Sequence, residues 1–318
     1  MSAYEVRDTQ PCILFGDAAE LRRLAARLGL RPEALQAVTE RELSEVPLGR
    51  VGLLDTGAVP QALIAQHGAH PVCGRAQLLS LEQAARSVLS GKTCALVTGP
   101  TSKAAINAAG IAFTGQTEFL AALDQRRSDD VSMLFLGPRL KVGLVTTHLS
   151  IASVPKQVTG PRVARTIRHL AQALCRLKPG QPVTLEVAGL NPHAGEGGLF
   201  GGEEGQVIAP AVAELREELE AALPQVRLGG PAPAESVFRA AARGDLDGVV
   251  AMFHDQATIA SKLLDWGAAV NTTWGLSFVR TSVDHGVAYD AAGSRSVDAS
   301  GMRAALAMAL RLAQGAHG

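Results

Sequence analysis

The sequence has few cysteines, no excess of either charge and no apolar run long enough to cross a membrane. Its four cysteines are scattered and form no CxxC pair, and no apolar targeting segment opens the chain. Such cysteine usage indicates reduced thiols in the cytoplasm. The 30 basic and 30 acidic residues balance, so neither nucleic acid nor a membrane surface is an expected partner. We therefore expect a cytoplasmic protein that acts on a small molecule.

The usual dinucleotide-binding fingerprint is also missing, because no GxGxxG follows an expected strand. The chain does contain enough apolar material for a large core. At 318 residues and 47% hydrophobic, it exceeds the size at which a single core usually stops growing. We therefore expect two lobes.

Apolar runs of strand length alternate with amphipathic helical stretches, a pattern typical of an α/β fold with a parallel sheet. Strands are expected at 94–99, 140–147, 182–189, 247–253, 268–274 and 277–282. Helices are expected at 18–30, 80–91, 161–177, 209–223 and 302–315. In the helix at 80–91, Ser80 and Gln83 fit a capping box and Gly91 fits a C-terminal stop.

A histidine follows each of three expected strands: His148 and His254 come directly after theirs, and His193 comes four residues after the strand at 182–189. Ligands of open parallel sheets bind at the carboxyl ends of the strands. Three imidazoles at that edge predict a divalent metal with open coordination positions, which is a catalytic arrangement. No cysteine lies near them, so a closed structural zinc site is disfavoured. Four other histidines are interpreted as surface residues: His67, His70, His169 and His317.

The loop GLNPHAGEGG at 189–198 places His193 between a proline and a run of glycines. Pro192 restricts the backbone on one side, and the glycines permit turns and close approach of a ligand on the other. Such a loop suits a binding site, although an isolated histidine in a turn is more often simply solvated. We expect it to aim His193 at a metal.

Cationic and polar residues elsewhere predict an anion site. Lys262, Asn271 and Arg280 follow His254, and the arginine fork suits a phosphate or carboxylate. The segment 98–119 adds Gln116 and Thr117 after glycine turns, where backbone amides at a helix start could hold an anion.

These motifs together resemble a known family. TGPTSKAAINAAGIAFTGQTEF, VTTH, AGLNPHAGEGG, GPAPAESVF, MFHDQA and VNTTWGLSFVRTSVDHG, in this order and over roughly residues 94 to 300, are similar to the 4-hydroxythreonine-4-phosphate dehydrogenases of vitamin B6 biosynthesis. The resemblance implies metal-dependent oxidation of 4-phosphohydroxy-L-threonine with NAD or NADP, followed by decarboxylation to 3-amino-2-oxopropyl phosphate.

The resemblance also implies a fold like that of the isocitrate and isopropylmalate dehydrogenases. We expect a homodimer of two-lobed α/β/α chains with the active site in the cleft between the lobes. The first α/β lobe would comprise residues 1–110 and 290–318. The second, residues 111–289, would carry the metal and substrate residues.

Site residues are carried over by position. The family's ligands to one divalent ion (Zn, Mg or Co) fall on His148, His193 and His254, one of them reaching across from the partner subunit. Its substrate contacts fall on Gln116, Thr117, Lys262, Asn271 and Arg280. Its adenosine contacts to NAD fall on the segment 284–293, at His285, Gly286 and Ala288. Asp255 is a candidate for the general base or for orienting a metal ligand.

Two features depart from the family. Its members open with a strand and a GDPAGIGPE-like loop, which we expect this chain to lack, and they have GHTE where this chain has GQTE with Gln116. Glutamine can donate a hydrogen bond but cannot become cationic. Three alternatives therefore stay open: a dehydrogenase of 4-phospho-threonate or 4-phospho-erythronate, a metal-dependent aldolase or hydrolase, or an inactive binding homologue.

Overall fold

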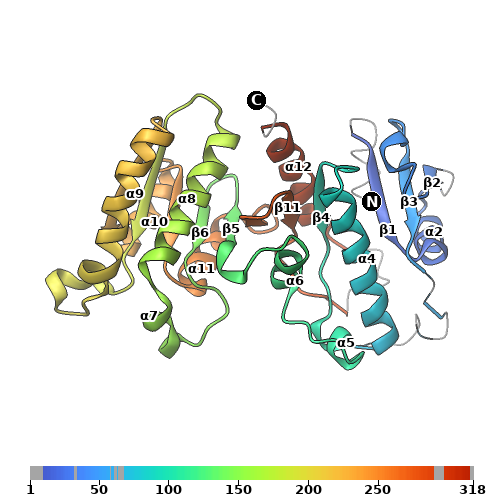
Figure 1. The fold of residues 1–318 in the computed structure, drawn as a ribbon, viewed down its shortest axis with the longest axis horizontal. Coiled ribbons are helices and arrows are strands. Elements are labelled where there is room, and N and C mark those ends of the chain that lie inside the picture. Colours follow the sequence, from blue (N-terminus) through green and yellow to red (C-terminus); the bar gives the residue numbers. More distant parts are fainter. Residues whose placement is uncertain are drawn as a thin grey trace. The chain divides into compact units, whose positions relative to one another are not determined.

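The computed structural model describes residues 10–31, 34–57, 59–60, 63, 68–289 and 297–315. The expected α/β fold is confirmed (Figure 1). The chain forms two compact units, Met1–Ser128 with Leu276–Ala309 and Asp129–Gly275 with Leu310–Gly318. No helix in the described part of the chain is long and apolar enough to span a membrane.

The boundaries between the units differ from those expected. Residues 111–128 and 276–289 lie in the first unit, not in the second. The reason is packing, since α6 (Gln116–Leu123) contacts α4 (Pro71–Leu89), and β11 (Val279–Ser282) pairs in parallel with β4 (Ala95–Thr98). Gln116 and Arg280 therefore belong to the first unit.

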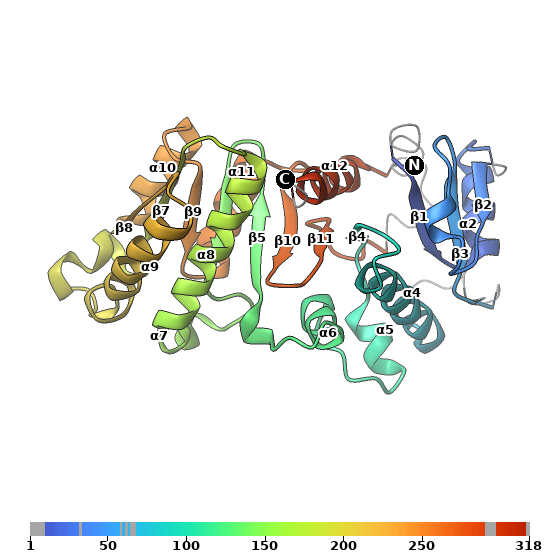
Figure 2. The ribbon, with the colours of Figure 1, turned by 45° about the horizontal axis from the view of Figure 1, so that its top comes forward.

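The first unit contains a small parallel sheet in the order β1-β3-β2 (Figure 2). Its strands are β1 (Cys12–Gly16), β3 (Val51–Asp55) and β2 (Leu35–Ala37). Asp17 alone connects β1 to α2 (Ala18–Arg27) and caps it by accepting from Glu20 N at 3.0 Å. The unit also contains η2 (Leu43–Glu45), α5 (Lys103–Ala108) and the start of α12 (Ser300–Gln314).

The helix expected at 80–91 begins earlier. α4 starts at Pro71, and His70 is its N-cap, accepting from Val72 N at 3.2 Å. Ser80 therefore lies inside the helix, where its hydroxyl donates to Ala76 O. Proline at the first helical position has no amide hydrogen to lose, which makes Pro71 the natural start. The predicted stop at Gly91 is confirmed, because α4 ends at Leu89 and Gly91 has a φ of +72°.

The second unit contains strands in the order β10-β5-β6-β9-β7-β8. β5 pairs antiparallel with β10 and β6, whereas β6, β9, β7 and β8 run parallel. These strands are β5 (Ser132–Leu136), β6 (Lys141–Leu144), β7 (Val183–Ala188), β8 (Val226–Ala232), β9 (Gly248–Ala251) and β10 (Val270–Trp274). The sequence pattern predicted β6, β7, β9 and β10 here and missed β5 and β8.

Helices cover both faces of this sheet (Figure 1). α8 (Gly160–Leu177) and α9 (Ala209–Ala222) lie on one face, and α10 (Ala234–Arg243) and α11 (His254–Leu264) on the other. Short helical segments complete the unit: η4 (Ile151–Ser153), α7 (Val154–Gln157), η5 (Pro192–Gly198) and η6 (Glu204–Ile208). The 3-10 turn η3 (Ser128–Asp130) stands where the first unit passes into the second.

His169 is not the surface residue that the sequence suggested. It lies half-buried on α8, and its Nδ1 is 2.9 Å from Ser132 Oγ. Burial lowers the pKa of His169 to about 4, and the positive charges of Arg165 and Arg168 add to the shift. Two of the other histidines interpreted as surface residues, His67 and His317, lie outside the described residues. The third, His70, caps α4.

The lowered pKa of His169 predicts acid sensitivity. Its pKa is about 4 against an ordinary 6.5, so the unfolded chain binds the extra proton as pH falls between these values. The free energy of unfolding should then fall by about 3 kcal/mol across this window. His169→Gln should lose that portion of the pH dependence. Urea unfolding of both proteins at about pH 7 and about pH 4.5 tests this, and equal acid losses would contradict it.

Candidate functional site

The three histidines that follow strands leave one edge of the second unit's sheet. β6, β9 and β7 are parallel neighbours, so their carboxyl ends meet at the same edge. Thr146 Oγ1 donates to Met252 O at 2.7 Å. This bond ties the segment that carries His148 to the segment that carries His254.

His148 and His254 lie beside each other. Their ring centroids are 5.4 Å apart and the rings are tilted by 43°. His254 is the first residue of α11, and its Nδ1 lies 2.7 Å from Asp255 Oδ1. This contact fixes the ring and directs Nε2 elsewhere, as a carboxylate does for a metal-ligating histidine. His148 is exposed, so an ion can reach it from solvent.

His193 stands in a left-handed stretch of η5. Residues 193–197 all have positive φ, between 42° and 80°, although three of them are not glycine. Such backbone is costly for residues with a side chain and is concentrated at functional sites. The His193 ring lies 6.1 Å, centroid to centroid, from Phe200. Across the described ranges no three His, Cys, Asp or Glu side chains gather closely enough to hold a metal, so His193 does not complete a site with the other two.

A buried carboxylate holds this loop in place, and the sequence reasoning missed it. Glu204, only 5% exposed, accepts from Asn191 N at 2.7 Å and from Asn191 Nδ2 at 3.0 Å. Gly195 passes so close that a Cβ there would lie 2.8 Å from Glu204 Oε2. The paired glutamates that follow two glycines at 201–204 were the available signal.

Gln256 is a second residue that was missed. Its Nε2 donates to Gly189 O at 2.9 Å, and its Oε1 accepts from Met252 N at 2.7 Å. One side chain therefore joins the loop of His193 to the segment of His254. It lies two residues past His254 and has no periodic pattern to reveal it.

In the first unit, a buried arginine forms the centre of a polar network. Arg280 on β11 is 4% exposed, and its Nη2 donates to Thr98 Oγ1 at 2.9 Å and to Gln116 Oε1 at 2.5 Å. Gln116 Nε2 in turn donates to Gly99 O at 2.9 Å and to Thr101 Oγ1 at 3.2 Å. Gln116 therefore acts as acceptor and donor at once, and both ends of its carboxamide are used.

Burial disfavours the positive charge of Arg280. Burial lowers the pKa of its guanidinium to about 10, and the negative charge of Glu118 opposes that shift. Gln116 and Thr117 open α6, whose first backbone amides lack carbonyl partners within the helix. A cation beside a helix start is a site that suits a bound anion.

The second unit holds the other two expected substrate contacts. Lys262 lies two turns after His254 on the same side of α11, with Thr258 between them. Asn271 lies on β10, and its buried Oδ1 finds no hydrogen-bond donor in the described part of the chain. A buried acceptor of this kind fits a group that a ligand supplies.

The segment expected to contact the cofactor is described only in part. His285 is exposed, with Nδ1 2.9 Å from Gly286 O, and Ala288 has a φ of 47°. Tyr289 donates from its hydroxyl to Ser102 Oγ at 2.7 Å, which ties the segment to the start of α5. Residues 290–293 of the expected motif lie outside the described residues.

Comparisons with known proteins show the family to which this chain belongs. The family model described as pyridoxal phosphate biosynthetic protein PdxA matches residues 8–309. A 4-hydroxythreonine-4-phosphate dehydrogenase of Geobacter metallireducens is 41% identical over 313 residues, covering 98% of this chain and 88% of the relative. A Cutibacterium acnes protein with the provisional name D-threonate 4-phosphate dehydrogenase is 38% identical over 298 residues, covering 93% and 83%.

A solved structure gives the same result. The 4-hydroxythreonine-4-phosphate dehydrogenase of Klebsiella pneumoniae is 33% identical and matches with a TM-score of 0.80, covering 95% of this chain and 88% of that one. The family model spans nearly the whole sequence, and the relatives match this chain over most of their length. The chain therefore belongs to the PdxA family of pyridoxal phosphate biosynthetic proteins.

Proposed function

We propose that this chain oxidises and decarboxylates 4-phosphohydroxy-L-threonine to 3-amino-2-oxopropyl phosphate, with a divalent metal and NAD or NADP, in the cytoplasm. The observation that carries the proposal is the pair of imidazoles, His148 and His254, at the carboxyl edge of parallel strands, with Asp255 orienting one of them. The names of the relatives supply the substrate.

Two imidazoles and an exposed approach suit a divalent ion such as Zn, Mg or Co. His148 and His254 would supply two ligands, and His193 of a second copy of the chain would supply the third. When bound by these imidazoles, such an ion would supply Lewis-acid chemistry at the substrate hydroxyl and at the ketone formed from it.

Asp255 is better suited to positioning than to taking the alcohol proton. Its Oδ1 already lies 2.7 Å from His254 Nδ1, and a carboxylate in that contact fixes the orientation and tautomer of the imidazole. We assign Asp255 the role of presenting His254 Nε2.

The polar network of the first unit would bind the negatively charged end of the substrate. Arg280 supplies the charge, the first amides of α6 around Gln116 and Thr117 supply donors, and the buried location strengthens both. In the second unit, Lys262 and Asn271 are proposed as substrate contacts on the resemblance to the family alone. His285, Gly286 and Ala288 would hold the adenosine part of the nicotinamide nucleotide, which would supply the hydride acceptor.

A second substrate deserves testing because of Gln116. A neutral carboxamide stands where the family has histidine, and one relative carries the provisional name D-threonate 4-phosphate dehydrogenase. A phosphorylated hydroxy acid such as 4-phospho-threonate is therefore the second candidate. Purified protein with divalent metal and NAD or NADP, assayed on each compound by absorbance of the reduced cofactor, decides between them, and no reduction with either would refute dehydrogenase activity.

The metal proposal makes a direct prediction. His148→Ala, His193→Ala and His254→Ala should each lower bound zinc to below about a tenth of wild type, and Asp255→Asn should weaken affinity by about 10- to 100-fold. Equilibrium dialysis followed by elemental analysis measures both effects. His70→Asn is the control, because it removes an imidazole and keeps a helix-capping acceptor. Full occupancy in all three alanine variants would exclude these ligands.

The network around Gln116 makes a second prediction. Gln116→Glu should pair with Arg280, since the two side chains are already 2.5 Å apart, and so reduce the attraction of Arg280 for an anionic substrate. We expect KM to rise by about tenfold or more while the fold stays intact. Gln157→Glu is the matched control, because Gln157 Oε1 accepts from Arg162 at 2.6 Å outside the proposed site. An unchanged KM in Gln116→Glu would contradict the assignment.

A homodimer would explain why one chain assembles only two of the histidines. An exposed apolar stripe supports it, with Ile259 60%, Leu263 80% and Trp266 80% exposed. Their spacing of four and then three residues places them along one side of α11 and just past its end. Apolar side chains clustered in solvent mark contact surfaces, and a second copy of the chain is the occupant we propose.

Disrupting this stripe should separate the subunits. The double variant Leu263→Asp with Trp266→Asp should be monomeric and should lose bound zinc, because burying a charge in an apolar interface is unfavourable. Light scattering at micromolar concentration measures the mass. Leu48→Asp, which alters an exposed leucine of the first unit (60% exposed), should remain dimeric. A monomeric wild type that turns over substrate would overturn the proposal.

A further inference from the structure

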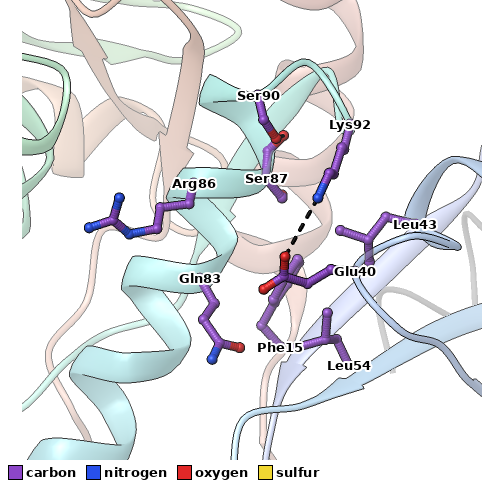
Figure 3. Close-up of a pocket in the computed structure, with 9 residues that line it drawn as sticks. All are labelled: Phe15, Glu40, Leu43, Leu54, Gln83, Arg86, Ser87, Ser90 and Lys92. Atoms are coloured by element: carbon purple, nitrogen blue, oxygen red, sulfur yellow. Dashed lines mark hydrogen bonds and ion pairs between the residues drawn. The ribbon is translucent and has the colours of Figure 1, made fainter.

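The first unit contains a cavity that the proposed reaction does not use. It lies between α4 and the small sheet, with a volume of about 190 Å³ (Figure 3). Its lining comes from α4 and the residues after it, from β1 and β3, and from the chain before β3: Phe15, Glu40, Leu43, Leu54, Gln83, Arg86, Ser87, Ser90 and Lys92. None of these residues is among the expected metal, substrate or cofactor contacts.

The two walls of the cavity differ in chemistry. One wall is apolar and consists of Phe15, Leu43 and Leu54. The other is a polar strip of α4, where Gln83 and Ser87 lie one turn apart on the same side. A helix that packs on a sheet normally presents apolar side chains to it, so a polar strip facing an apolar wall leaves a space suited to a molecule with both characters.

The Ser87 hydroxyl of this strip already has hydrogen-bond partners. The Gln83 carboxamide oxygen has none in the described part of the chain. Ser87 Oγ donates to Ala84 O at 2.9 Å and lies 2.8 Å from Thr93 Oγ1. Gln83 Oε1 is buried and accepts from no donor among the residues that the structure describes. Figure 3 shows the Gln83 carboxamide directed toward Phe15 and Leu54. The cavity thus suits an apolar molecule that also has one hydrogen-bond donor.

The mouth of the cavity is polar and close to neutral. Lys92 Nζ lies 3.6 Å from Glu40 Oε2, with the two side chains 40% and 70% exposed. Arg86 pairs with Glu82 at 2.7 Å. Because each cation has an acidic partner, the entrance does not select for net charge, and the interior determines what binds.

The volume limits the size of the molecule. An apolar cavity of about 150 Å³ accommodates benzene, so 190 Å³ accommodates one six-membered ring with a small substituent. We propose that this cavity binds a single aromatic ring that carries a hydroxyl or amino donor, with the ring against Phe15, Leu43 and Leu54 and the donor on Gln83 Oε1.

The test compares two probes that differ only in the donor. Fluorine NMR titration of the full chain with 4-fluorophenol and with fluorobenzene measures each affinity. We expect saturable binding of 4-fluorophenol at least tenfold tighter than that of fluorobenzene. Gln83→Leu should bring the two affinities to within about twofold, because only the hydrogen bond distinguishes the probes. Gln36→Leu, the same change at an exposed position of β2, should leave the difference intact.

A measurement on the unaltered protein keeps the test independent of whether Gln83→Leu folds. Nuclear Overhauser effects should join the ring protons of 4-fluorophenol to the methyl groups of Leu43 and Leu54. Absence of saturable binding would show that water alone fills the cavity and would overturn the proposal. Equal affinities for both probes in the wild type, or cross-peaks to other leucines only, would also overturn it.

Discussion

The parallel pairing of β6, β9 and β7 is the constraint on which the candidate metal site depends. Each strand is short and buries its valine and leucine side chains, and a one-residue shift of the pairing would move every side chain to the opposite face of the sheet. With that register, the segments after the strands must emerge at one edge, and the histidines follow within a few residues. The hydrogen bonds of Thr146 and Gln256 then join the segments that carry the three histidines. The packing of the sheet therefore places the three histidines at one edge.

How far the sequence predicts this fold depends on how each element is buried. β9 is recognisable because it is buried throughout, and β7 because its valines and leucine alternate with Thr184 and Glu186. β5 is equally apolar and was still missed, because a short apolar run gives no period that separates strand from helix. The start of α4 was missed because Gly74 breaks the helical pattern. That glycine is present for tertiary reasons, since a Cβ there would collide with the backbone of Ala105.

The same limit applies to the candidate site. The positions of His148, His193 and His254 could be read from local order, because each follows its own strand. Glu204 and Gln256 could not, because their partners, Asn191 and Gly189, are brought to them by the fold. The assignment of Gln116 and Arg280 to the second lobe was wrong for a related reason: β11 pairs with β4, about 180 residues earlier in the chain, and sequence proximity to β10 conceals this.

The antiparallel hairpin of β5 and β6 has a consequence for how the second unit folds. It joins residues as close as Leu136 and Lys141, whereas β6 must meet β9 across the span from Val142 to Val249. Closing a short loop costs less chain entropy than closing a long one, and local pairings form faster. The hairpin can therefore form early. The other edge of β6 can pair with β9 only after about a hundred further residues, including α8 and β7, have been synthesised.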